Sequence, residues 1–390
     1  MAAAVEMLWE HATLGRSPFV ACGTKFDRYS LNVSIHPDRD IPYLNPEQQS
    51  EIEGNPATAV EKTHYARDFE RKHDKQGTIL VDDEITFPEL RNILQEYQFA
   101  SPGDLHAACV GLCKDGALAE LFEGIIQKLD GGGDSSDGLR RHLPLSDAIM
   151  HLERLQRLGS KPAKRVRTRD AGAGKLVKRN TTPDPVGYAL TVVKALVAVL
   201  RYKHDRLKQS IPPSWNICAH MYDTRWASFL MTLLGAAMQD VHVDGWSNGL
   251  SVISALEEEQ SIIVLWNGYT VVKTVLELSK DYDRVMQSAP QDADPEEFWW
   301  HVVTKRLEFM GMGAGFVHPV RIRLLPGKTL VFHFHTPHCG DNRPGLRVHK
   351  YMMHADDYHE YATTPDLRID DEMFPAIYSF DLGPQRTALA

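Results

Sequence analysis

The stretch 324–347 has the sequence LLPGKTLVFHFHTPHCGDNRPGLR. It begins with a turn at Pro326-Gly327, continues as an alternating run of apolar, β-branched and aromatic residues, and ends in three closely spaced histidines. Pro-Gly pairs mark turns, and a period of two is typical of a half-buried strand. This stretch therefore predicts a strand that carries histidines, which are common metal ligands, to one end of a β-sheet.

Other segments show the same period of two and the same enrichment in β-branched residues. They are Trp215 to Tyr222, Asp240 to Asp244, Leu250 to Leu256, Ser261 to Trp266, Val320 to Leu325, Thr329 to His335 and Arg347 to His354. So many short strands separated by turn residues predict a barrel or a sandwich. An amphipathic helix from Pro295 to Met310 is expected as an insertion between two of them.

The residues before these strands follow other patterns. Residues 1–58 show no sustained period and predict an irregular segment, whereas residues 59–158 predict a mostly helical region, and residues 159–182 a basic linker. The expected helices are Phe87 to Tyr97, Leu105 to Cys113, Leu118 to Leu129, Leu145 to Leu158, a long one from Pro185 to Lys208, and Trp226 to Met238. The chain is thus expected to be an α+β protein whose strands lie in residues 183–390.

Two polar segments allow a sharper interpretation. The helix, acidic glycine-rich loop and second helix around Asp130 are similar to an EF-hand, but the twelfth residue from Asp130 is Arg141 instead of a closing Glu. We therefore expect a flexible loop or a degenerate EF-hand-like pair, and no functional calcium site. The basic tract favours a solvated linker, with phosphate binding or nuclear targeting as the alternative.

Composition limits the cellular setting. The 390 residues carry a formal charge of −9, which gives no overall attraction for nucleic acid or an anionic membrane. The 5 cysteines contain no CxxC pair, the N-terminus lacks a secretion signal, and the most apolar stretch, Gly187 to Leu200, is interrupted by Lys194. We expect no membrane span and a reducing compartment, cytoplasmic or nuclear.

A 2-His-1-carboxylate metal site needs His-x-Asp or His-x-Glu on a strand and a later histidine on a neighbouring strand. With 18 histidines and 52 acidic residues, about two or three such triplets are expected by chance. The chain has four: His36-Pro-Asp38, His151-Leu-Glu153, His242-Val-Asp244 and His354-Ala-Asp356.

The surroundings of the four triplets favour His242-Val-Asp244. His36 lies in a proline-flanked irregular stretch, His151 lies in an expected helix, and His354 ends a strand with only His359 after it. Only Asp244 and its neighbour His242 lie in a strand that is followed by a second histidine-bearing strand.

The stretch from about 215 to 354 resembles the iron(II)/2-oxoglutarate dioxygenases with a double-stranded β-helix core (jelly-roll or cupin-like). The likeness is to JmjC-type hydroxylases and, less closely, to phytanoyl-CoA-hydroxylase-like enzymes. Pro326-Gly327 matches the turn that opens the strand before the distal histidine in those families, and Asn342 matches an Asn that often follows that ligand. The long gap between Asp244 and His338 is most similar to the JmjC pattern.

The resemblance implies that His242, Asp244 and His338 hold Fe(2+) and supply the catalytic centre, with 2-oxoglutarate and O2 as cosubstrates and ascorbate as an optional addition. His333 and His335 remain alternatives for the distal ligand, although His338 lies past the turn-like Thr-Pro. The implied reaction converts 2-oxoglutarate to succinate while a C–H bond is hydroxylated, or a methyl group on a heteroatom is removed.

The distal carboxylate of 2-oxoglutarate needs a buried cation. Arg347 is the first candidate, and Asn342 and Lys273 complete the expected cosubstrate-binding set. JmjC enzymes commonly use a lysine on a strand after the acid ligand instead, and Lys273 lies far along the sequence from Asp244 for that role. Two other functions stay open: a cupin-type metal dioxygenase without 2-oxoglutarate, and a non-catalytic scaffold that binds a partner. A protein side chain and a small metabolite are equally compatible substrates; the basic linker is compatible with nucleic acid, but the overall acidity argues against strong duplex binding.

Overall fold

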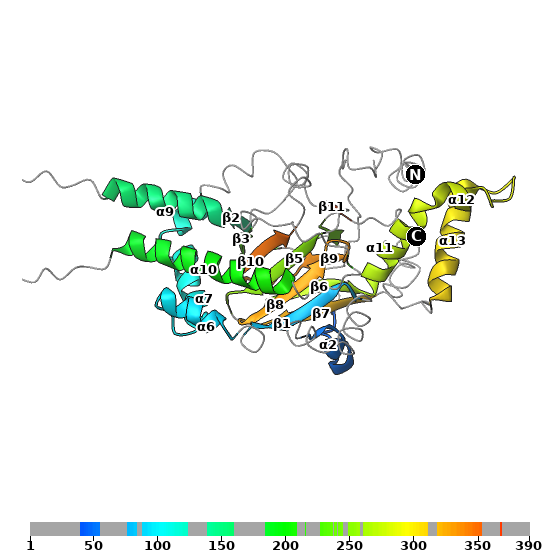
Figure 1. Cartoon of the computed structure of the whole chain (residues 1–390). Helices are drawn as coiled ribbons and strands as arrows, with labels where there is room; N and C mark the ends of the chain where they lie inside the picture. Colours follow the sequence, from blue (N-terminus) through cyan, green and yellow to red (C-terminus); the bar gives the residue numbers. More distant parts are fainter. Residues whose placement is uncertain are drawn as a thin grey trace, which may run out of the picture.

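The computed structural model describes the residues from which two sheets and their surrounding helices are built (Figure 1). They are residues 40–54, 76–83, 88–123, 139–159, 184–208, 215, 227–236, 238–239, 241–244, 249–257, 260–310, 318–352 and 367–368. The EF-hand-like loop, the basic linker, His36 and His354 lie outside these residues.

Every named strand pairs antiparallel with its neighbours in one of two sheets. The larger sheet has the order β1-β8-β5-β10-β3-β2, formed by Thr78–Asp82, Lys328–His333, Leu250–Ala255, Gly345–Met352, Ala227–Thr232 and Arg140–Pro144. The smaller sheet has the order β11-β4-β9-β6-β7, formed by Leu367–Arg368, His242–Val243, His338–Gly340, Gln260–Trp266 and His318–Leu324.

Alternation along the strands gives the larger sheet an inner and an outer face. The inner-face residues Ile253 and Phe332 belong to the same hydrophobic cluster as Ile262 and Val264 of the smaller sheet. The outer-face residue Val331 belongs instead to a second cluster that is shared with the helices. The two inner faces therefore enclose a core between the sheets, which is the arrangement of a sandwich or a double-stranded β-helix.

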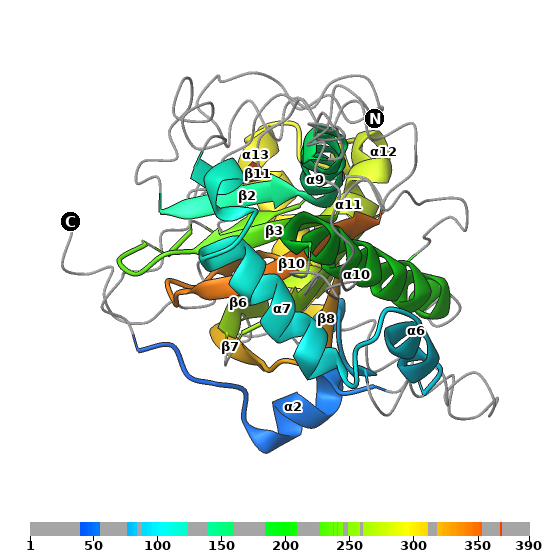
Figure 2. The ribbon, with the colours of Figure 1, turned by 90° about the vertical axis from the view of Figure 1, so that its left-hand side faces the viewer.

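Four helices cover the outer face of the larger sheet, and three of them, α7, α9 and α10, lie in front of it in Figure 2. They are α6 (Leu90–Glu96), α7 (Pro102–Lys114), α9 (Leu145–Gly159) and α10 (Pro185–Lys208). Length and composition alone would let α10 cross a membrane. Its apolar residues Val193, Leu196 and Leu200 are buried against the sheet and the other helices, and this core role accounts for its composition.

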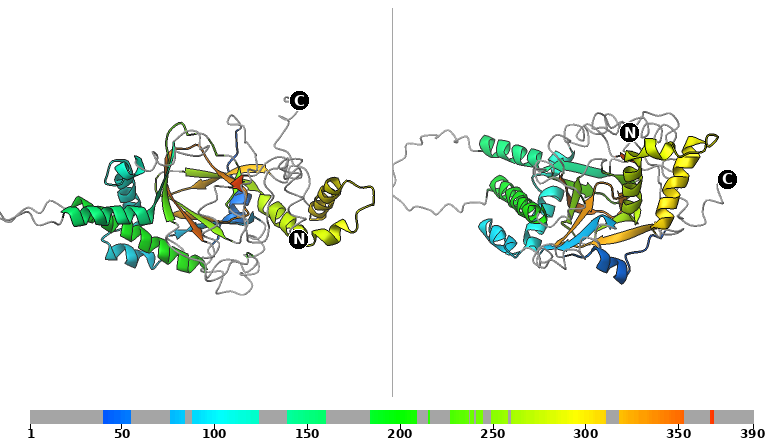
Figure 3. Two further views of the ribbon diagram at one scale, coloured as in Figure 1. Left: turned by 90° about the horizontal axis from the view of Figure 1, so that it is seen from above. Right: turned by 45° about the vertical axis from the view of Figure 1, so that its right-hand side comes forward.

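A second group of elements lies at the other end of the sheets, as both panels of Figure 3 show. It contains α11 (Gly268–Lys280), α12 (Tyr282–Met286) and α13 (Pro295–Phe309). The expected helix at Pro295 to Met310 is confirmed by α13. A short helix, α2 (Pro46–Ile52), begins with a capping box in which Asn45 and Gln48 bond each other's backbone N–H groups.

The helix predicted from Trp226 to Met238 is wrong, because Ala227–Thr232 forms β3. Alanine, leucine and methionine favour helix locally, but Phe229 and Met231 alternate with Ser228 and bury their side chains in the outer cluster. Tertiary packing therefore overrides the local propensity.

The helical region expected at 59–158 also contributes two strands. β1 pairs with β8, and β2 pairs with β3. The described parts of this region and of residues 183–390 consequently share one hydrophobic core instead of forming separate cores.

A buried ion pair links α10 to the loop after β1. The ammonium group of Lys203 donates to the carboxylate of Asp83, and both side chains are at least 96% buried. Thr329 adds a hydrogen bond to the same carboxylate at 3.1 Å. Burial raises the pKa of Asp83, while the charge of Lys203 acts in the opposite direction.

We expect Lys203→Met to lower the free energy of unfolding by about 3–5 kcal/mol, because it leaves the buried Asp83 carboxylate without its counter-charge. Urea unfolding measures this. Lys194→Met on the same helix is the matched control; its ion pair with Glu153 is exposed, so we expect a loss of less than about 1 kcal/mol. Equal losses in the two variants would contradict a special role for the buried pair.

Candidate metal and cosubstrate site

Strand pairing brings the His-x-Asp segment beside the second histidine strand. His242 on β4 lies directly opposite His338 on β9. The backbone N–H of Asp244 then donates to the carbonyl oxygen of Phe334 at 3.1 Å, which continues the pairing past the end of β4. This register places two segments that are almost 100 residues apart at one end of the smaller sheet.

The side chains of Asp244 and His338 meet in the core. The Nε2 atom of His338 lies 3.6 Å from Oδ1 of Asp244, and the residues are 3% and 1% exposed. The hydroxyl of Ser251 on β5 donates to the other carboxylate oxygen. The larger sheet therefore helps to orient an acid that is supplied by the smaller one.

The hydrogen bond of His338 selects its tautomer. Its Nδ1 atom lies 3.0 Å from the carbonyl oxygen of Thr336, which can only accept, so Nδ1 carries the proton. The lone pair is left on Nε2, the atom that faces Asp244. The ring of Phe332 lies 4.3 Å from the imidazole, measured between centroids, and packs against it. A backbone carbonyl that fixes the ring in this way is typical of metal-binding histidines.

The structure thus brings together Asp244 and His338, two of the three expected ligands. For His242 it describes the backbone, opposite His338, and not the side chain. The side chains that the structure does describe contain no group of three His, Cys, Asp or Glu residues able to hold a metal.

His333 lies on the opposite face of its strand from Phe332, with its ring 5.2 Å from Tyr269 and 5.9 Å from Trp215. Its Nδ1 atom accepts the backbone N–H of His335 at 3.1 Å, and burial lowers its pKa well below the usual value. The ring of His335 packs on that of His333 at 4.5 Å. The packing partners of His333 are therefore on the helix-covered side of the larger sheet.

Arg347 on β10 is 5% exposed and points between the sheets, as its cross-strand neighbour Ala255 of the inner cluster does. Its Nε atom is buried without a hydrogen-bond partner, and no ion pair joins its guanidinium to the described residues. Burial first, and then the charge of Arg140, lower its pKa to about 9. The charge of Asp341 acts in the opposite direction, but no ion pair forms between the two side chains, and a buried cation without an ion-pair partner is costly unless an anion binds there.

Gly340 places this cation relative to His338. A Cβ atom on Gly340 would lie 3.0 Å from an Nη atom of Arg347, so the guanidinium lies over this glycine. Gly340 and His338 are alternate residues of β9 and face the same side, about 6.6 Å apart along the strand. The acid–imidazole pair and the buried arginine therefore lie on one inner surface.

The other two expected cosubstrate residues lie elsewhere. Asn342 is exposed, next to the buried Asp341. Lys273 is on α11, where its ammonium group lies 5.8 Å from the ring centroid of Tyr269 and its charge acts on His333. Neither side chain has a described contact with Asp244, His338 or Arg347.

Two site residues were missed in the sequence. Ser251 alternates with Ile253 in the predicted strand Leu250 to Leu256, so a polar residue on an apolar face was a usable signal. Arg140 gave no signal, because its surroundings were assigned to a helical region.

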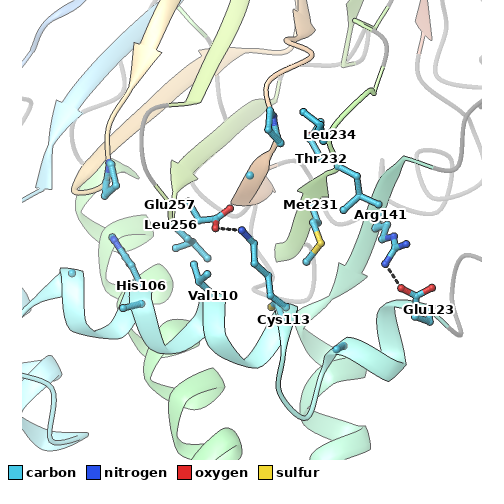
Figure 4. Close-up of a pocket in the computed structure, with 18 residues that line it drawn as sticks. His106, Val110, Cys113, Glu123, Arg141, Met231, Thr232, Leu234, Leu256 and Glu257 are labelled. Atoms are coloured by element: carbon cyan, nitrogen blue, oxygen red, sulfur yellow. Dashed lines mark hydrogen bonds and ion pairs between the residues drawn. The ribbon is translucent and has the colours of Figure 1, made fainter.

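A cavity of about 860 Å³ opens on the outer face of the larger sheet. Figure 4 shows it between α7 and the strand ends, with Val110, Met231 and Leu256 on its walls and the ion pair of Arg141 with Glu123 at one side. None of the expected metal or cosubstrate residues lines it.

Comparison with known proteins gives no family assignment: no family model matches, and no curated protein matches. Solved structures with partial likeness include a dioxygenase for auxin oxidation from rice, with 15% identity, a TM-score of 0.37, and coverage of 82% of this chain and 85% of that one. Another is the non-heme alpha ketoglutarate dependent carbocyclase SnoK from nogalamycin biosynthesis, with 10% identity, a TM-score of 0.30, and coverage of 78% and 93%.

A third is EvdO2 from Micromonospora carbonacea var. aurantiaca in complex with 2-oxoglutarate, with 17% identity, a TM-score of 0.23, and coverage of 55% and 86%. Likeness at this level does not place the chain in a family.

We expect Arg347→Met to raise the free energy of unfolding of the ligand-free protein by about 1–2 kcal/mol, because it removes a buried charge that lies near Arg140. Arg343→Met is the control, since Arg343 is partly exposed and lies against Tyr43. Urea unfolding at neutral pH compares the two. A clear destabilisation by Arg347→Met would mean that the arginine is a structural residue.

Proposed function

We propose that this chain is an iron(II)- and 2-oxoglutarate-dependent oxygenase that hydroxylates or demethylates its substrate. The observation that carries the proposal is the buried contact between Asp244 and His338, on the same inner surface as the buried cation of Arg347. The Asp244–His338 pair fits a metal ion, and the cation of Arg347 fits a carboxylate of a dicarboxylate.

The donor set suits iron(II). One carboxylate and two neutral imidazoles form the 2-His-1-carboxylate set, and His242 would supply the second imidazole from its place opposite His338. The chemistry that bound iron supplies in such sites is oxygen activation, coupled to the conversion of 2-oxoglutarate to succinate.

The protein's own residues would hold this set in place. Thr336 keeps the Nε2 lone pair of His338 available, and Ser251 orients the carboxylate of Asp244. The apolar side chains of Phe332 and Val264 exclude water beside the imidazole. Arg347 would bind the distal carboxylate and so orient the cosubstrate toward the metal.

Arg347 also separates the two enzyme hypotheses. A cupin-type dioxygenase without 2-oxoglutarate has no need for a buried cation at the position of Arg347. A non-catalytic scaffold has no need for either the cation or the Asp244–His338 pair. The unpartnered Nε atom of Arg347 therefore favours the 2-oxoglutarate-dependent reaction.

Anaerobic titration with iron(II), with and without 2-oxoglutarate, tests the proposal through the weak visible charge-transfer band of the ternary complex. In wild type we expect the band only when both iron(II) and 2-oxoglutarate are present, and in His338→Ala we expect no band. Arg347→Met should need a 2-oxoglutarate concentration roughly 50-fold higher or more to give half of the full band. His301→Ala on the exposed side of α13 and Arg343→Met are matched controls and should behave as wild type.

Iron binding that is insensitive to 2-oxoglutarate would favour the cupin-type reaction. Absence of iron binding in the wild type would refute the metal site and leave the scaffold as the better hypothesis.

A further inference from the structure

The cavity on the outer face of the larger sheet is separate from the proposed metal site, because neither the expected metal ligands nor Arg347 line it. Its volume of about 860 Å³ lies within the range of roughly 300–1,000 Å³ that is typical of small-molecule sites. We propose that this cavity binds a small carboxylic acid with an apolar body, whose carboxylate pairs with Arg141. Such a ligand binds whether or not the chain is an oxygenase.

The sheet side of the cavity is built on one row of paired residues. Arg141 on β2 lies opposite Met231 on β3, and Met231 lies opposite Leu346 on β10. Met231 and Leu346 are buried in the outer hydrophobic cluster. Leu256, which donates its backbone N–H to the carbonyl oxygen of Leu346 at 3.0 Å, continues this apolar surface past the end of β5. Arg141 therefore places a guanidinium at the edge of an apolar wall.

Short side chains on α7 leave room beside this wall. Gly103, Ala107 and Val110 have the spacing i, i+4 and i+7, so they share one face of the helix, and all three line the cavity. In Figure 4 the side chain of Val110 points from α7 toward Leu256. Because the other two residues of this face carry at most a methyl group, the helix leaves space against Met231 and Leu256.

Two ion pairs border the cavity, and they differ in which partner is the more exposed. Lys114 donates to one carboxylate oxygen of Glu257, and the other oxygen accepts the backbone N–H of Leu346 at 2.6 Å. Both oxygens of Glu257 therefore have a donor. In the second pair, the side chain of Arg141 is 21% exposed and that of Glu123 is 60% exposed. Glu123 can leave this pair for water at little cost, since exposed ion pairs contribute little to stability.

Arg141 has donors left for a ligand. Its Nη1 atom donates to Glu123, and its Nε atom is buried without a hydrogen-bond partner among the described residues. A guanidinium binds a carboxylate best through two N–H groups. The carboxylate of a ligand can therefore take the place of Glu123, while its apolar body packs on Met231 and Leu256.

Titration calorimetry of the full chain, without iron or 2-oxoglutarate, tests this site independently of the proposed function. The probes are octanoate, octan-1-ol and octylammonium, which share one apolar chain and differ in the charge of the head group. Wild type should bind octanoate roughly 10-fold more tightly, or more, than either of the other two. Arg141→Met should remove this preference. Arg157→Met is the matched control, because Arg157 is an exposed arginine of α9 that does not line the cavity.

Glu123→Gln distinguishes ligand binding from a purely structural role of Arg141. This variant removes the carboxylate that competes for the guanidinium, so octanoate should bind several-fold more tightly than it does to wild type. Glu153→Gln is the control, since it removes the acid that pairs with Arg157 on α9, and it should leave the affinity for octanoate unchanged.

Ala107→Trp places a large side chain in the cavity without a change of charge. Ala107 is exposed and lines the cavity, so the variant should fold, and octanoate should bind roughly 10-fold more weakly or worse. Gln95→Trp is the control, at an exposed position of α6 that does not line the cavity, and it should bind as wild type does. Far-UV circular dichroism checks the fold of both variants.

The opposite results would overturn the carboxylate site. They are absence of octanoate binding, octanoate binding that is no tighter than that of octan-1-ol, and binding that is unchanged in Ala107→Trp. A preference for octylammonium would also overturn it and would assign the cavity to cations. Because iron and 2-oxoglutarate are absent from these titrations, each of these results leaves the proposed function intact.

Discussion

The pairing of β4 with β9 is the constraint on which the rest of the site depends. A single register position sets His242 opposite His338, and the continuation of that pairing brings Asp244 within 3.6 Å of the imidazole. A shift of one residue would turn these side chains to the opposite faces of their strands and separate them. The chain between these two strands forms β5 to β8, and α11, α12 and α13 lie between β6 and β7, so the helices are compatible with the pairing of β4 and β9.

The two faces of the larger sheet have different surroundings: the outer face packs against helices, and the inner face lines the space between the sheets. Its outer face is sealed by α10 and the neighbouring helices, and the buried pair of Lys203 and Asp83 belongs to that layer. Its inner face carries Ser251, which donates to Asp244, and the buried Arg347, to which the proposed function gives a role in binding. Arg347 is the buried cation of this face, and a buried charge that costs stability is common at functional positions.

The sequence predicts most strands of the C-terminal half better than it predicts the strands and helices that pack around them. The turn at Pro326-Gly327 forms as expected, with a positive φ of 85° at Gly327, and β5, β6, β7, β8 and β10 lie within a few residues of the predicted strands. β1, β2 and β3 were not predicted, because their strand character comes from pairing partners far along the chain and not from local propensity. The nearness of Arg140 to Arg347 also depends on this long-range pairing, so the local sequence does not reveal it. The face on which His333 lies does follow from the local sequence, because His333 alternates with Phe332.

The proposed function requires one metal ion held by His242, Asp244 and His338. X-ray absorption spectroscopy of the anaerobic iron(II)-loaded protein tests it most directly, because imidazole rings give a distinct multiple-scattering pattern that can be counted. The account predicts two imidazoles and otherwise oxygen ligands in wild type, and one imidazole in His338→Ala. A wild-type spectrum without imidazole scattering, or one that is unchanged in His338→Ala, would contradict it.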